Sequence, residues 1–256
     1  DIFHLNTGDI NIVGGGGHDV ADAAIVSGTP ISLTDHRFSV DDLTVQVSDS
    51  LEMFKLSDAA AQSILISDHQ INGSGWGDAG LTLDAAGLID MSQVTFVAPG
   101  GHLALYGQGI KGNGNDNALV TQVHTLTVVN TSDSEFADIV VREQDDIAIA
   151  ANYHPQGGLY TQAGKIDVQL ASQDARLFHR SGVITTGQSD QDITIVADDV
   201  DFWAGEGSVS ATGQFWLQSQ TPEQVYKIGQ AAQSVYGDDY SNRGPDGSID
   251  FSMQDM

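Results

Sequence analysis

The sequence predicts an all-β protein folded as a right-handed parallel β-helix, a form of β-solenoid, and three observations lead to this prediction. Short segments of alternating apolar and polar residues recur along the chain, which is typical of strands with one buried face. Glycine, aspartate and serine separate these segments and mark turns. The apolar positions also recur at a fixed distance, which indicates stacked coils that share one core.

The repeat is clearest between residues 164 and 213, which read as two successive coils of three short strands each. Both coils end on Thr-Gly-Gln, at residues 186–188 and 212–214. A step of 27 residues relates the first strand of one coil to the first strand of the next. The apolar pairs related by this step are Ile139 and Val141, Ile166 and Val168, and Ile193 and Ile195.

The rest of the chain is expected to follow the same plan. The first two strand-like segments are residues 2–5 and 9–13. The alternation of apolar and polar residues becomes regular from Leu81. Pro222 follows Thr221 in a helix-capping pattern, so a short helix or an irregular loop is expected there.

We therefore predict that residues 1–256 are a single β-solenoid segment of a longer protein. Residues 81–229 would form its most regular coils, and residues 230–256 would be less regular. An antiparallel β-sandwich is the alternative, because short strands separated by turn residues fit it too. A β-sandwich, however, would give no reason for the fixed spacing of 27 residues between the apolar pairs.

The charge of the chain restricts its partners. With 35 acidic residues against nine Lys and Arg, the formal net charge is −26. Such a chain argues against nucleic acid and anionic membranes as partners, repels its own copies and attracts cations. No apolar run approaches the roughly 18 residues of a membrane span, so no membrane insertion is expected. The chain has no cysteine, which excludes disulfides and thiolate chemistry.

The segments 125–150, 162–172, 181–187 and 192–229 resemble the repeats of very large bacterial surface proteins of the filamentous-haemagglutinin-like kind. The resemblance covers about residues 81–229. It implies a secreted, extracellular solenoid at the bacterial cell surface that acts in adhesion, biofilm or extracellular structure, without catalytic residues. The expected partners are neighbouring coils of the parent chain and a surface carbohydrate or other cell-surface ligand. Any lateral self-association of the rods is expected to depend on cations that bridge them.

Two glycine-rich loops resemble the calcium-binding nonapeptide of RTX proteins, which makes calcium the one candidate cofactor. Glycines allow a tight turn whose carbonyls, together with an aspartate, can surround a hard cation. Each loop stands alone, however, whereas RTX sites form between consecutive repeats, so an ordinary glycine-rich turn is the alternative. The candidate ligand positions are Gly15, Gly17 and Asp19 in the first loop, and Gly112, Gly114 and Asp116 in the second.

A carbohydrate-active enzyme, a lyase or glycosidase, is the other alternative, because β-helices carry such activities. Adjacent carboxylates occur at Asp145-Asp146 and Asp198-Asp199, among others. Neighbouring side chains on a strand point to opposite faces, so these pairs are expected to begin or end turns. Trp203 and Trp216 are candidates for stacking on sugars or for core packing. We expect no enzymatic activity.

Overall fold

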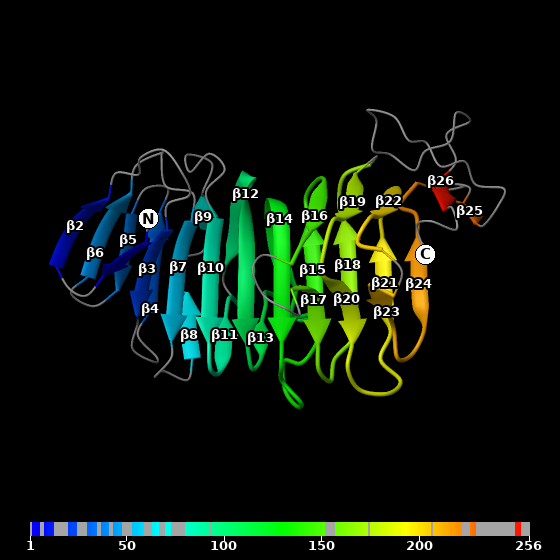
Figure 1. Ribbon diagram of the computed structural model, residues 1–256, viewed down its shortest axis with the longest axis horizontal. Coiled ribbons are helices and arrows are strands. Elements are labelled where there is room, and N and C mark those ends of the chain that lie inside the picture. Colours follow the sequence, from blue (N-terminus) through cyan, green and yellow to red (C-terminus); the bar gives the residue numbers. More distant parts are fainter. Residues whose placement is uncertain are drawn as a thin grey trace.

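The computed structural model is all-β and forms a parallel β-solenoid, with its coils stacked in chain order along the long axis (Figure 1). Residues 80–221 are described in full, except residues 93, 152–156, 174 and 206. Elsewhere only the backbone of the strands is described. No helix occurs among these residues. The prediction of a β-solenoid is therefore confirmed.

Each of the carboxy-terminal coils contains three strands, as the sequence predicted, and we number the resulting sides of the solenoid faces 1, 2 and 3. Face 1 contains β15 (Ile139–Glu143), β18 (Ile166–Leu170), β21 (Ile193–Val196) and β24 (Phe215–Gln218). Face 2 contains β16 (Ile147–Ile149), β19 (Arg176–His179) and β22 (Asp199–Phe202). Face 3 contains β17 (Gly158–Thr161), β20 (Val183–Thr186) and β23 (Val209–Ser210).

The 27-residue register is confirmed by the strand pairing. Ile139 lies opposite Ile166, and Ile166 lies opposite Ile193, in parallel ladders. The pairing continues with a shorter step to Phe215 in β24. All the pairs between these coils are parallel, so the antiparallel sandwich is excluded for this part of the chain.

In the preceding coils, faces 2 and 3 merge into one side. The chain runs along face 1 and then along the merged side within single long strands, β12 (Thr95–Gly107) and β14 (Leu119–Asn130). β14 then pairs with β16 and β17 separately, which is where the merged side divides. The other strands here are β7 (Met53–Asp58), β8 (Ser63–Ile66), β9 (Gln70–Asn72), β10 (Gly80–Ala85), β11 (Leu88–Asp90) and β13 (Ile110–Lys111).

The amino-terminal strands depart from the pattern. β5 pairs antiparallel with both β4 and β6, whereas β1 and β3 continue the parallel ladder toward β7. These strands are β1 (Ile2–Leu5), β2 (Gly8–Ile12), β3 (Val20–Ala24), β4 (Pro30–Thr34), β5 (Arg37–Val40) and β6 (Leu43–Val47).

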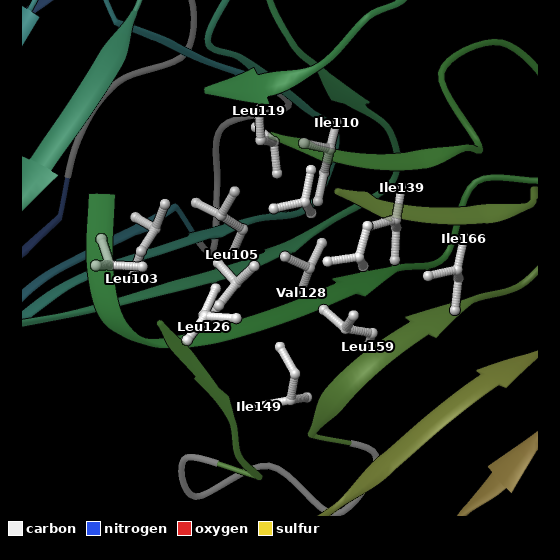
Figure 2. Close-up of a cluster of buried hydrophobic side chains, with 14 of the residues drawn as sticks. Leu103, Leu105, Ile110, Leu119, Leu126, Val128, Ile139, Ile149, Leu159 and Ile166 are labelled. Carbon is white, nitrogen blue, oxygen red and sulfur yellow. The ribbon is translucent and has the colours of Figure 1, made fainter. Parts of the chain in front are cut away.

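The core is a set of aliphatic rows that run through successive coils, and Figure 2 shows such side chains from several coils meeting in the interior. Leu126, Ile149 and Leu159 belong to it and are fully buried. Each coil covers the inner side chains of the one before it, so the coils depend on their neighbours for stability. Close stacking also constrains the backbone. Gly158 has a φ of 114°, and a Cβ there would lie 2.2 Å from the carbonyl oxygen of Val183 in the next coil.

The segment after Thr221 contains a strand where a short helix or an irregular loop was expected. Tyr226–Ile228 form strand β25, which pairs in parallel with β26 (Ile249–Phe251). Residues 222–225 lie outside the described residues, as does most of the segment 230–256.

Candidate functional site

The second predicted calcium loop forms a tight turn that is closed by its own hydrogen bonds. The amides of Asn113 and Ala118 each donate to the carbonyl of the other residue, at 2.6 and 3.0 Å. The side chain of Asn117 accepts from the amide of Gly112 at 2.8 Å and donates to the carbonyl of Ile110 at 3.1 Å. Gly114 has a φ of 69°, which explains why glycine is needed there. An ordinary turn accounts for these glycines.

The carboxylate of Asp116 faces a cation of the protein itself. Its Oδ2 lies 3.5 Å from the guanidinium of Arg142, which also contacts Oδ1 of Asp167 at 3.1 Å. A calcium ion at Asp116 would have to compete with this guanidinium. Among the residues described with side chains, no group of three or more His, Asp or Glu residues is arranged to hold a metal. Gly15, Gly17 and Asp19 lie outside the described residues.

Asp145, Asp146 and Asp198, from the adjacent pairs within the described residues, each bind neighbouring groups at turns. Asp145 accepts a hydrogen bond from the side chain of Gln122 at 3.0 Å, whereas Asp146 accepts from the amide of Arg176 at 2.7 Å. Asp198 binds the loop after β24, accepting from the hydroxyl of Thr221 and from nearby amides. These contacts agree with the expectation that the pairs lie at turns.

One cluster of charged residues lies on the outer side of face 2, where sequence reasoning did not place one. Asp199 and Asp201 occupy outer positions two residues apart on β22, and Nε of Arg176 lies 3.6 Å from Oδ2 of Asp199. The guanidinium of Arg176 also lies 5.0 Å from the ring centre of Phe178. Both carboxylates are buried, with at most 3% of each residue exposed. The sequence pattern that could have predicted this cluster is Asp-Val-Asp-Phe in β22, because alternation along a strand places both aspartates on the same side of the sheet.

A carboxyl group lies inside the solenoid, and its position follows from the alternation along β15. Glu143 is the fifth residue of the strand and points inward, like Ile139 and Val141, with 0% of the residue exposed. Its Oε2 is 2.7 Å from the hydroxyl of Thr121, and its Oε1 accepts from the amide of Gln144 at 2.9 Å. Burial raises the pKa of Glu143 to about 8, although these hydrogen bonds act in the opposite direction.

His179 is the second buried titratable residue, at an inner position of β19 between Ile149 and Phe202. Its ring packs edge-on against the ring of Phe202, with 6.2 Å between centres. Burial lowers the pKa of His179 to about 4, so the imidazole is neutral at physiological pH.

The two tryptophans whose role was open are both on the surface. Trp203 is 55% exposed and follows β22, and Trp216 is 47% exposed on the outer side of β24. Asn130 begins the formal glycosylation sequon Asn130-Thr131-Ser132, but it is fully buried. Its side chain accepts from the amides of Gly109 and Ser132 and donates to two carbonyls, so it fixes a turn and is inaccessible to modification.

The fold places the protein in the class of parallel β-solenoids, with a carboxyl group and an imidazole buried in the core. No family model matches the chain, and no match occurs among the curated proteins or the solved structures. Among the described residues no helix is long and apolar enough to cross a membrane.

Proposed function

We propose that the protein is a structural and adhesive β-solenoid segment of a large secreted or cell-surface bacterial protein. The observation that supports this most directly is the in-register stacking of the coils, in which equivalent residues of β15, β18, β21 and β24 form continuous rows. Parallel strands about 4.8 Å apart, each bonded to its equivalent, make a stiff rod that holds binding groups away from an anchor. Its role is mechanical and needs no catalytic residue.

The net charge of −26 fits this setting. Rods with this charge stay soluble and repel one another unless cations lie between them. We therefore propose that lateral association, where it occurs, depends on divalent cations. Light scattering with chelator and then with millimolar calcium tests this, and equal scattering in both would contradict it.

Adhesion itself is tested with coated beads. Beads that carry the protein should attach to bacterial biofilm matrix or cultured cells, and the control is Leu177→Asp, which places a charge at a fully buried position of β19. Scattering at small angles should show an elongated particle for the wild type and an expanded one for the variant. Attachment no stronger than that of the control beads would refute the adhesive role.

A carbohydrate-active enzyme is the second candidate, and the cluster of Asp199, Asp201 and Arg176 favours it. Two carboxyl groups about 6.5–9.5 Å apart suit inverting glycoside cleavage. The burial of both aspartates puts them out of reach of a polysaccharide in this conformation, which ranks this candidate lower. Release of reducing ends or unsaturated sugars that disappears in Asp199→Asn and Asp201→Asn would establish it.

A calcium-dependent module of the RTX kind is the third candidate, and it depends on Asp19 and Asp116. Thermal unfolding followed by circular dichroism, first with chelator and then with calcium, tests it. The self-contained turn around Asp116 supports equal stability in the two conditions. A large calcium-dependent rise of the melting temperature that is lost in Asp19→Asn or Asp116→Asn would establish the module instead.

A further inference from the structure

Face 1 has an outer surface made of aligned rows of side chains. Because side chains alternate across a strand, every second residue of each face 1 strand points outward, and parallel pairing places these residues in line from coil to coil. One row consists of Thr95, Val120, Arg142, Gln169, Val196 and Gln218. A second row consists of Val140, Asp167, Thr194 and Trp216.

This surface carries almost no net charge, although the chain is strongly acidic. The two rows contain two charged residues, Arg142 and Asp167. These form an ion pair, with 3.1 Å between the guanidinium of Arg142 and Oδ1 of Asp167. The exposed and half-exposed carboxylates of this part of the solenoid lie mostly in the turns between strands. Those in the turns are Asp116, Asp133, Glu135, Asp138, Asp145, Asp146, Asp190 and Asp192.

The uncharged groups of face 1 combine hydrogen-bonding side chains with an aromatic ring. Gln169 and Gln218 are exposed amides, Thr194 is a half-exposed hydroxyl, and Trp216 presents an indole that is 47% exposed. A sugar ring offers an apolar C–H face and a rim of hydroxyl groups. An indole beside amide and hydroxyl groups complements both parts of such a ring.

We infer that the outer surface of face 1 binds an uncharged polysaccharide, with Trp216 stacking on the chain and Gln169 and Gln218 bonding to its hydroxyls. The inference rests on the proposed adhesive function and names its ligand class and surface. The distribution of charge favours a neutral glycan over a second copy of the chain. A second copy of the chain would bring its own turn carboxylates against those that border face 1, whereas a neutral glycan meets no such repulsion.

The test is a pull-down with insoluble cellulose, chitin and β-1,3-glucan, followed by titration with soluble xylan and mixed-linkage glucan. The variants are Trp216→Ala and Gln169→Ala, both at exposed positions whose truncation leaves the core intact. Trp203→Ala is the matched control, because Trp203 is similarly exposed but lies after β22, outside face 1. Anionic alginate and cationic chitosan serve as charge controls, and circular dichroism verifies the fold of each variant.

We expect binding to at least one neutral glycan at both 50 mM and 500 mM salt, at least about tenfold weaker in Trp216→Ala, which corresponds to about 1.4 kcal/mol. Gln169→Ala should weaken it less, and Trp203→Ala should leave it unchanged. Three results would overturn the inference: no binding to any neutral glycan, equal binding by Trp216→Ala, or dimerisation of the free protein that Trp216→Ala abolishes. Coated beads that still attach while neutral glycans do not bind would refute this inference and leave the adhesive function standing.

Discussion

Replacing Glu143 by glutamine should stabilise the protein at neutral pH, contrary to the usual effect of a change in a core. The carboxyl group is fully buried at an inner position of β15, and burial raises its pKa from the ordinary 4.5 to about 8. The folded state therefore holds the neutral acid at pH 7, whereas the unfolded chain is ionised. Because the pKa of Glu143 is higher in the folded state than in the unfolded chain, the free energy of unfolding is highest below about pH 4.5 and decreases as the pH rises toward 8.

The size of the effect follows from this difference in pKa. Each unit corresponds to about 1.4 kcal/mol, so the shift lowers the free energy of unfolding by about 3 kcal/mol at pH 7 relative to pH 4. Glutamine keeps the hydrogen bonds, because its amide oxygen can accept from Gln144 and its NH₂ can donate to the hydroxyl of Thr121. The variant should match the wild type at pH 4 and exceed it by about 3 kcal/mol at pH 7.

Urea unfolding measured at intervals from pH 4 to pH 9 is the assay. Glu135→Gln is the control, since it removes the same charge from an exposed turn and leaves the buried Glu143 in place. If Glu143→Gln and the wild type lose stability in parallel as the pH rises, Glu143 does not titrate in this range. The reasoning from burial would then be refuted.

Three further predictions concern other buried residues. His179→Leu should gain about 2 kcal/mol of stability relative to the wild type between pH 8 and pH 5, because a folded pKa of about 4 against 6.5 in the unfolded chain costs the wild type that much at pH 5; urea unfolding of both proteins at pH 5 and pH 8 checks this, and a stability difference between them that is the same at both pH values would contradict it. Leu177→Ala should lower the free energy of unfolding by about 2–5 kcal/mol through the cavity it leaves, whereas Leu88→Ala, at a half-buried position, should cost less; equal losses would be evidence against the shared core. Asn130→Ala should cost about 2–5 kcal/mol by leaving the amides of Gly109 and Ser132 without their acceptor, and a melting temperature within 1 °C of wild type would show that this turn needs no side chain.

Alternation and register decided much of the architecture from the sequence alone. The step of 27 residues between Ile139, Ile166 and Ile193 correctly gave both the stacking and the pairing partners, because parallel in-register coils repeat one inner pattern. The inward position of Glu143 also follows from the sequence, since Glu143 comes two residues after the inward Val141 on the same strand. Its burial depended on the next coil, which places Leu170 over it.

Other features arise only when the coils are assembled. Whether Asp116 was free for a metal depended on Arg142, which lies 26 residues later but meets it because the chain returns to face 1 once per coil. The exposure of Trp203 and Trp216 was likewise open, because a tryptophan in a strand or just after one can either pack into the core or point outward. The strand periodicity is a local property of the backbone and can be read from the sequence, whereas partners across coils depend on the length of each turn. For that reason the sequence by itself determined the solenoid and its core rows, and the tertiary structure decided which charges meet and which side of the rod is left neutral.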